Sequence, residues 1–207
     1  MPKIVDHDLR REEVLAAVWR VITRKGIQNT TTRLIAKEAG YSSGVLAHYF
    51  ADKEDILASA LRLSHRRIRE RWQGQLAGLH GLGALKELVL DNLPLDEERE
   101  LETKLEMSFW SRTLSDETFA AVQRAEATEL LEKLEALLEE ARDRGELAEG
   151  ANIPLIARRL LALIDGLSLH ALLYPDWVSA ESQLAILEQE FERLRGPVAV
   201  VAEPRAS

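Results

Sequence analysis

Apolar residues recur every three or four positions along nearly the whole chain, which is the period of an amphipathic α-helix. Val14, Val18, Val21 and Ile22 form the first such set. The helix that they predict should end near Gly26, because glycine readily adopts the left-handed conformation that closes a helix. No segment is convincing as a β-strand, so the pattern predicts an all-α protein of about nine helices.

Capping residues and helix breakers mark the boundaries of the remaining helices. Ser, Thr, Asp and Asn side chains accept hydrogen bonds from the first N–H groups of a helix, and glycine or proline ends one. By these signals the further helices are expected at about 29–40, 42–50, 53–74, 82–92, 96–113, 117–145, 152–174 and 179–195. Residues 196–207 are expected to form a flexible tail.

Two short helices near the N-terminus, joined by a tight turn at Gly40, have the layout of a helix-turn-helix. Ile35 on the first can face Leu46 and Phe50, which are four residues apart on the second. The outer face of the second helix would then present Ser43, Gly44, Ala47, His48 and, at its edge, Tyr49. Residues 40–51 contain no Asp or Glu, so such a helix could enter the major groove of DNA without repelling phosphates.

The charge distribution differs between the two parts of the chain. The net charge is −8, yet residues 1–72 carry 14 Lys and Arg against 9 Asp and Glu, whereas residues 73–207 carry 13 against 26. A basic N-terminal part can approach phosphates, and an acidic remainder is repelled by them. The asymmetry favours a nucleic-acid partner for the N-terminal part, although ordinary surface variation would also produce it.

The stretch TTTRLIAKEAGYSSGVLAHYFADKEDIL resembles the DNA-binding domain of TetR-family transcriptional regulators. The resemblance covers about residues 8–68, with the helix-turn-helix at 31–50. The HYF triplet and the following DK are most similar to the choline-responsive BetI-like branch, as is LALIDGLSLHALL at 161–173. It implies a ligand-binding and dimerisation domain at 69–195. The function implied is that of a repressor which binds a palindromic operator as a homodimer and is released by a small-molecule effector.

The resemblance also implies which residues contact DNA. Arg33 would reach a base edge, Val45 would lie at the groove floor, and Lys53 would meet a backbone phosphate. The implied DNA-binding residues are Thr31, Thr32, Arg33, Ser42, Ser43, Gly44, Val45, Ala47, His48, Tyr49 and Lys53. Many family members have Thr and Tyr where this chain has Val45 and Ala47, so a hydrogen bond to DNA is expected to be lost or shifted.

The helix expected at 152–174 is apolar around most of its circumference, so it should be covered on two sides. The helix after it repeats apolar residues at spacings of three and four, and the two helices with their copies could form a four-helix bundle about a two-fold axis. The dimer interface expected from these stripes consists of Leu161, Ile164, Leu172, Leu184, Leu187, Phe191 and Leu194. A central core helix in a monomer would give the same pattern.

Aromatic residues gather near residue 110 and could line an apolar effector pocket. The residues expected there are Glu106, Met107, Phe109, Trp110, Phe119, Leu163, Leu167 and His170. Glu102, Glu106 and Asp165 would suit a cationic ligand if they were buried. The alternative interpretation places the aromatic residues in the core and the two glutamates on a solvated face.

No catalytic or metal-binding constellation is visible. The chain has no cysteine, its five histidines lack ligand spacing, and it has no Gly-rich phosphate loop. We therefore expect no enzyme activity, no cofactor, no metal and no membrane association, in a cytoplasmic, nucleoid-associated protein. The alternative that stays open is a helical small-molecule-binding or scaffold protein without DNA binding.

Overall fold

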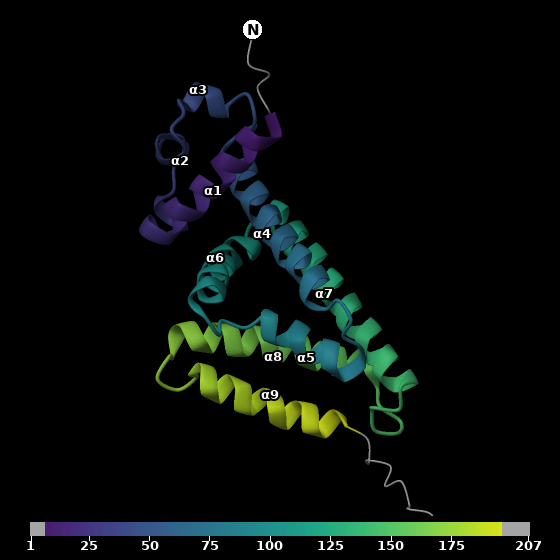
Figure 1. Cartoon of the computed structure of the whole chain (residues 1–207). Helices are drawn as coiled ribbons and strands as arrows, with labels where there is room; N and C mark the ends of the chain where they lie inside the picture. The colour runs from purple at the N-terminus through teal and green to yellow at the C-terminus, as the bar shows by residue number, and fades with distance from the viewer. Residues whose placement is uncertain (1–6, 196–207) are drawn as a thin grey trace, which may run out of the picture. The chain divides into compact units, whose positions relative to one another are not determined.

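The computed structural model describes residues 7–195, and these form nine α-helices, a short 3-10 helix at Ile27–Asn29 and no β-strand (Figure 1). The α-helices are α1 (His7–Lys25), α2 (Thr32–Ala39), α3 (Ser43–Leu46), α4 (Lys53–Gln75), α5 (Gly81–Asp91), α6 (Glu97–Thr113), α7 (Glu117–Asp143), α8 (Ile153–Leu173) and α9 (Ala180–Leu194). The expected all-α fold is confirmed. The predicted tail at 196–207 lies outside the described residues.

The predicted capping residues account for the helix starts. Thr31, Ser42, Asp96, Asn152 and Ser179 each accept a hydrogen bond from a backbone N–H group three residues further on. The side chain of the residue before α4 acts in the same way, because Asp52 Oδ1 lies 2.8 Å from the backbone N of residue 55. Local side-chain chemistry therefore determines where these helices begin.

The second helix of the helix-turn-helix is shorter than predicted. We expected it to continue to Phe50, but α3 ends at Leu46. The backbone then continues in turns, with His48 N bonded to Val45 O at 3.1 Å and Tyr49 N bonded to Leu46 O at 2.9 Å. These bonds span three residues instead of four, so the last part of the segment is wound more tightly than an α-helix.

The chain divides into two compact units. Of the described residues, the first contains 7–75 and 93–129, and the second contains 76–92 and 130–195. In the first unit, α1, α2 and α3 lie around the N-terminal end of α4 (Figure 1). One apolar core joins them to α6 and α7, and its largest fully buried side chains include Ile35, Leu46, Leu61, Phe109 and Phe119. The predicted domain boundaries, 8–68 and 69–195, remain predictions.

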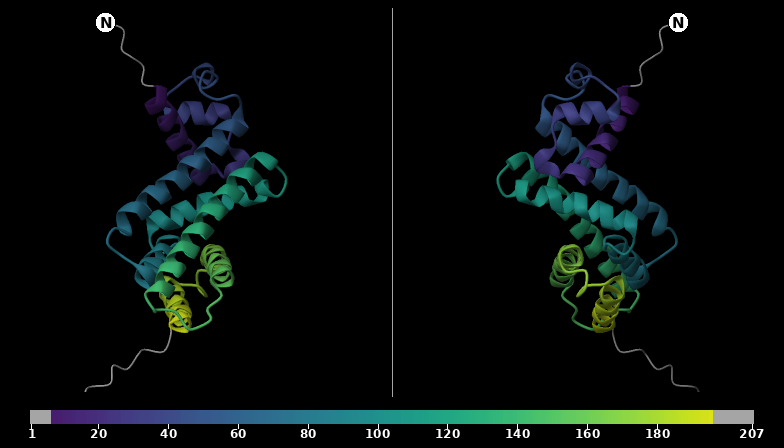
Figure 2. Two further views of the ribbon diagram at one scale, coloured as in Figure 1. Left: turned by 90° about the vertical axis from the view of Figure 1, so that its right-hand side faces the viewer. Right: turned by 90° about the vertical axis from the view of Figure 1, so that its left-hand side faces the viewer.

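The second unit is formed by α5, α8, α9 and the C-terminal part of α7. Figures 1 and 2 show α8 and α9 side by side. An ion pair between Lys86 and Glu188 joins α5 to α9, and Ser168 Oγ of α8 donates to the carbonyl oxygen of Asn92 at 3.4 Å. Leu160, Leu187 and other buried apolar residues fill the space between these helices.

Candidate DNA-binding site

The turn between α2 and α3 depends on one glycine. Gly40 follows α2 with φ of 76°, in the left-handed region that favours glycine. Tyr41 N donates to Ala36 O at 2.9 Å across this turn, which completes the hydrogen bonding at the end of α2. Ser42 then caps α3 by accepting from Val45 N at 3.3 Å. The two short helices are thus joined by only three residues.

The inner side of α3 is held by buried apolar side chains, as the sequence predicts. Leu46 is 1% exposed and Phe50 is 4% exposed, and both belong to the same core cluster as Ile35 and Ala36 of α2. Burial of a side chain the size of Leu or Phe contributes roughly 1.5–3 kcal/mol. A one-turn helix is not stable alone, so this anchoring defines where α3 lies.

The outer side of α3 is accessible and carries no acidic side chain. Ser43, Gly44, Ala47 and His48 are exposed, whereas Val45 and Tyr49 are half-buried. Small side chains keep this surface close to the backbone, which a helix needs if it is to lie deep in the major groove. Helical spacing predicts that Ser43, Gly44, Ala47 and His48 lie on the outer side, and their exposure agrees with that prediction.

Helix α1 contributes to the site in a way that the sequence did not reveal. Arg11 donates from Nη1 to the carbonyl oxygen of Tyr49 at 2.7 Å and lies over the Phe50 ring at 4.4 Å. A hydrogen bond with Tyr49 raises the pKa of Arg10, and the His7 ring lies 5.4 Å from the Tyr49 ring. Tyr49 is therefore packed against the basic start of α1. The only sequence signal for this was the basic pair at positions 10 and 11.

The α2 side of the site presents cations and hydroxyl groups. Arg33 is exposed, Thr32 and Lys53 are half-buried, and Thr31 is exposed while its oxygen accepts from Leu34 N at 3.2 Å. The one acidic residue of α2, Glu38, is paired with two arginines of α1, which lower its pKa through hydrogen bonds and charge. The negative charge that α2 carries is thus compensated.

Comparison with known proteins agrees with this geometry. Residues 14–60 match the family model for bacterial regulatory proteins of the tetR family, and residues 81–196 match the model for the C-terminal domain of BetI-type transcriptional repressors. The chain belongs to the TetR family. It is therefore a DNA-binding transcriptional regulator of the repressor type, and the resemblance to the BetI-like branch is confirmed.

Several TetR-family relatives match over almost their whole length. The regulator PksA of Bacillus subtilis is 32% identical over 94% of this chain and 94% of its own, and BetI of Stenotrophomonas maltophilia is 31% identical over 90% and 93%. A regulator from Saccharomonospora viridis, crystallised with choline, is 24% identical with a TM-score of 0.83 over 89% of this chain and 96% of its own. At that identity the structural likeness shows the fold alone.

The residues predicted to line an effector pocket in this TetR-family chain divide between the two units. Glu106, Met107, Phe109, Trp110 and Phe119 lie in the first unit, and Leu163, Leu167 and His170 lie in the second. Both phenylalanines are fully buried and their rings stack at 5.6 Å. These two rings therefore belong to the core of the first unit, as the alternative interpretation stated.

The interpretation that placed Glu102 and Glu106 on a solvated face is wrong. Arg71 holds Glu102 through two hydrogen bonds of 2.9 Å, and Glu106 Oε2 lies 2.9 Å from Nε2 of the buried His65. Sequence spacing could not show these pairs because their members are 31 and 41 residues apart. His65 itself was missed, although it lies four residues after Leu61 on the buried side of α4.

The predicted dimer interface runs partly through the interior of one chain. Ile164, Leu187, Phe191 and Leu194 are at most 4% exposed, so a partner could add little to their burial. Leu161 and Leu172 are half-buried, and Leu184 is 46% exposed. The large apolar side chains that α8, α9 and their connection leave exposed are Leu155, Leu173, Tyr174, Trp177, Leu184 and Ile186.

Neither a cluster of metal-ligating side chains nor a helix that could span a membrane is found among residues 7–195. No group of three or more His, Asp or Glu side chains there is arranged to hold a metal ion. None of the helices in that range is both long enough and apolar enough to span a membrane.

Proposed function

We propose that this TetR-family protein represses transcription by inserting α3 into the major groove of a palindromic operator. The observation that carries the proposal is the exposed outer side of α3, which has small and polar residues and no carboxylate and is fixed from behind by Leu46 and Phe50. A surface of this kind approaches base edges closely and does not repel the phosphates on either side.

The roles follow from the position of each side chain. Ser43, Gly44 and Val45 face the groove floor, where the Val45 methyl groups suit a thymine methyl, and Ala47 adds a second small apolar contact. His48 and Tyr49 contact phosphates, and Arg33 reaches a base edge while Thr32 and Lys53 bind the backbone. The side-chain oxygens of Thr31 and Ser42 accept hydrogen bonds within the protein. Each hydroxyl group can still donate its own hydrogen to a DNA phosphate.

The dimer forms, in this proposal, on the apolar side chains that α8 and α9 leave exposed. Leu173, Trp177, Leu184 and Ile186 are each at least 40% exposed. Large apolar residues in that number are typical of surfaces that bind another protein. The half-buried Leu161 and Leu172 complete the surface. A two-fold axis through it would present two α3 helices to successive major grooves, about 34 Å apart.

A small molecule releases the operator in the proposed mechanism. The relatives support an effector of this class, because one solved structure is of the Saccharomonospora viridis regulator in complex with choline and another is of the Stenotrophomonas maltophilia repressor SmeT in complex with triclosan. The pocket residues Glu106, Met107, Trp110, Leu163, Leu167 and His170 remain candidates for contact with it. A ligand that prefers the conformation unable to bind DNA shifts the population towards it. We assign the protein no enzyme activity and place it with its DNA in the cytoplasm.

The operator proposal is tested by titrating the DNA that flanks the gene with the purified protein and with its Arg33→Ala variant. We expect specific binding that weakens steeply with salt. The variant should bind about 5- to 150-fold more weakly, because one base contact by arginine is worth about 1–3 kcal/mol. A helical binding protein without DNA function would show neither a specific complex nor any effect of Arg33.

The dimer proposal is tested by light scattering at micromolar concentration. The wild-type protein should have twice the 23.3 kDa mass of the chain. Leu184→Glu should shift the mass towards that of one chain, because it places a charge in the proposed interface. Leu9→Glu is the matched control, since Leu9 is also exposed, at 56%, but lies in α1. A monomeric wild-type protein, or equal masses for both variants, would contradict this interface.

A further inference from the structure

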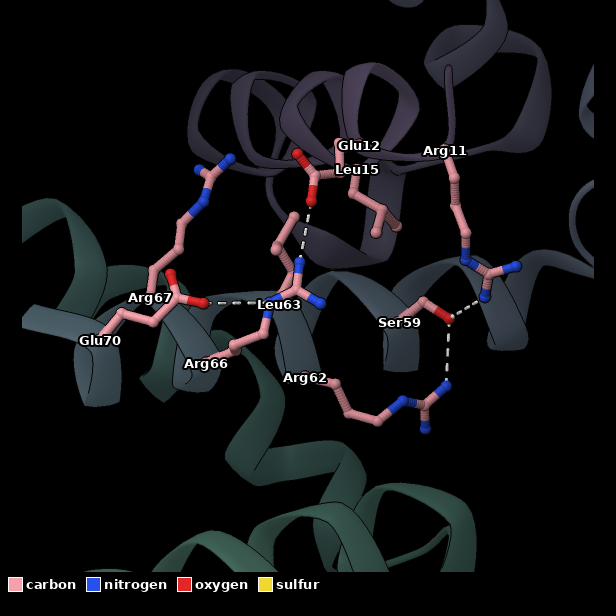
Figure 3. Close-up of a pocket in the computed structure, with 9 residues that line it drawn as sticks. All are labelled: Arg11, Glu12, Leu15, Ser59, Arg62, Leu63, Arg66, Arg67 and Glu70. Atoms are coloured by element: carbon pink, nitrogen blue, oxygen red, sulfur yellow. Dashed lines mark hydrogen bonds and ion pairs between the residues drawn. The ribbon is translucent and has the colours of Figure 1, made fainter. Parts of the chain in front are cut away.

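A groove of about 640 Å³ between α1 and α4 lies inside the first unit and carries an excess of positive charge (Figure 3). Four arginines line it, Arg11 from α1 and Arg62, Arg66 and Arg67 from α4, against the two glutamates Glu12 and Glu70. Its volume is in the range of small-molecule sites. None of the residues that line the groove is among those that the family resemblance assigns to DNA or to the effector.

Two of the guanidinium groups meet at a single neutral atom. Nη2 of Arg11 and Nη2 of Arg62 each lie 3.0 Å from Ser59 Oγ, and Figure 3 shows them approaching this serine from opposite helices. Ser59 in turn donates to Asp55 at 3.3 Å, and Asp55 lies 3.7 Å from Arg62. Two like charges held this close repel each other. An anion that bridges them would remove the repulsion.

The carboxylates of the groove lie at its other end. Arg66 contacts both of them, with Nη2 at 2.9 Å from Glu12 and Nε at 3.8 Å from Glu70, as the dashed lines in Figure 3 show. Glu12 and Glu70 are therefore shared with Arg66, whereas the carboxylate that lies near Arg62 is that of Asp55, at 3.7 Å. Arg67 extends beside them with its guanidinium carbon 5.7 Å from the centre of the Trp19 ring.

We propose that this groove binds a small phosphate-bearing anion through Arg11 and Arg62, and that the bound anion weakens operator binding. The planar guanidinium group has five N–H donors and binds phosphate oxygens in pairs. Arg11 and Arg62 make few hydrogen bonds within the protein, so each has donors that can be directed to such an anion.

Arg11 connects the groove to the DNA-binding surface. The same guanidinium group that contacts Ser59 through Nη2 donates through Nη1 to Tyr49 O at 2.7 Å and covers the Phe50 ring. An anion that draws Arg11 into the groove competes with the bond to Tyr49, which helps to position the segment after α3. Binding of the anion and binding of the operator then oppose each other, and each lowers the affinity for the other equally.

Calorimetric titration with inorganic pyrophosphate tests the site directly, without magnesium and at constant ionic strength. The wild-type protein should bind one pyrophosphate per chain with a Kd below about 1 mM. Arg62→Gln should weaken binding at least about tenfold, since a charge-assisted hydrogen bond is lost. Arg67→Gln changes an arginine at the other end of the groove, beside Trp19, and should weaken binding less than Arg62→Gln does. Arg124→Gln is the matched control, because Arg124 is 63% exposed and lies in the same unit on α7.

Operator titrations with and without pyrophosphate show whether the groove binds a free anion or a phosphate group of the operator. Saturating pyrophosphate should weaken operator binding by the wild-type protein and Arg124→Gln at least about fivefold, and should have less effect on Arg62→Gln. Without pyrophosphate, Arg62→Gln should bind the operator as the wild type does. If Arg62→Gln alone weakens operator binding and lowers its salt dependence, the groove contacts DNA and the proposal is wrong. Unchanged pyrophosphate binding by Arg62→Gln would equally overturn it.

Discussion

Operator binding is expected to fall at least roughly 100-fold when Gly44 is replaced by glutamate, while stability changes by no more than about 0.5 kcal/mol. Gly44 is exposed on the outer side of α3. A β-carbon placed there would have Ser42 Oγ as its nearest neighbour at 3.8 Å, an ordinary contact. The substitution therefore leaves the fold intact and brings a negative charge to DNA. Fluorescence anisotropy with an operator fragment measures the loss, and thermal unfolding measures stability.

Two control variants separate the effect of a negative charge on α3 from the effect of side-chain volume and from that of the net charge of the protein. Gly44→Gln has the same size without the charge, so it reports what the added side chain costs by its volume alone. Gly83→Glu adds the same charge in α5, at a glycine whose β-carbon would have no neighbour within 4 Å. We expect the order of operator affinity to be wild type and Gly83→Glu, then Gly44→Gln, then Gly44→Glu. Equal affinities for the two Gly44 variants would mean that this surface does not face phosphates.

The parts of the site that could be predicted from sequence depend on residues close together in the chain. The capping hydroxyls of Thr31 and Ser42 act on N–H groups three residues away, and Leu46 and Phe50 are one helical turn apart. The turn at Gly40 needs only one left-handed residue. Short-range patterns of this kind carry their own physical cause, so the helix-turn-helix and its outer surface follow from the sequence directly.

The contacts that were missed join residues far apart in the chain. Arg11 reaches Tyr49 across 38 positions, and His65 reaches Glu106 across 41. The residues predicted for the dimer interface divide into buried and exposed ones for a related reason. The stripes of α8 and α9 are apolar on both the side facing their own chain and the side facing away, so Leu187 and Leu184 look alike in sequence, yet one is 1% and the other 46% exposed.

The cluster around His65 shows what such a long-range contact does to stability. His65 of α4 is 3% exposed. Its Nε2 lies 2.9 Å from Glu106 of α6, and its Nδ1 lies 3.5 Å from Glu126 of α7, which also pairs with Arg69. Gln123 completes the hydrogen bonding of Glu106. Burial opposes the charge on His65, but the hydrogen bond and the charge of Glu106 outweigh it, and the pKa of His65 is raised.

The carboxylates of the cluster respond in opposite directions. Burial opposes the charge of Glu106, yet its hydrogen bond with His65 leaves the pKa of Glu106 lowered. Burial raises the pKa of Glu126 against the attraction of His65 and Arg69. Both pKa shifts favour the charged forms of His65 and Glu106, and this pair joins α4 to α6 in the interior of the first unit.

Removing Glu106 is expected to cost about 3 kcal/mol of unfolding free energy, because the buried His65 loses its 2.9 Å contact and keeps only the longer contact of 3.5 Å with Glu126. Glu106→Ala should show this loss in chemical denaturation at pH 7. Thr103→Ala is a suitable comparison, since Thr103 lies in the same helix and its hydroxyl bonds only to the backbone at Arg99. A loss for Glu106→Ala no larger than that for Thr103→Ala would contradict a stabilising pair.

The same pair should make stability depend on pH. A histidine whose folded pKa is raised stabilises the fold fully below its unfolded value, near 6.5, and this stability is lost as pH rises through the folded pKa. The Tm of the wild-type protein should therefore fall as the pH rises above about 6.5. His65→Gln keeps a hydrogen bond to Glu106 but cannot titrate, so its Tm should be lower near pH 6 and flatter above it. The control is His80→Gln, which removes a histidine that is 58% exposed; its Tm should depend on pH as that of the wild type does. If the Tm of His65→Gln depended on pH in the same way as that of the wild type, His65 would hold no charge in the folded protein.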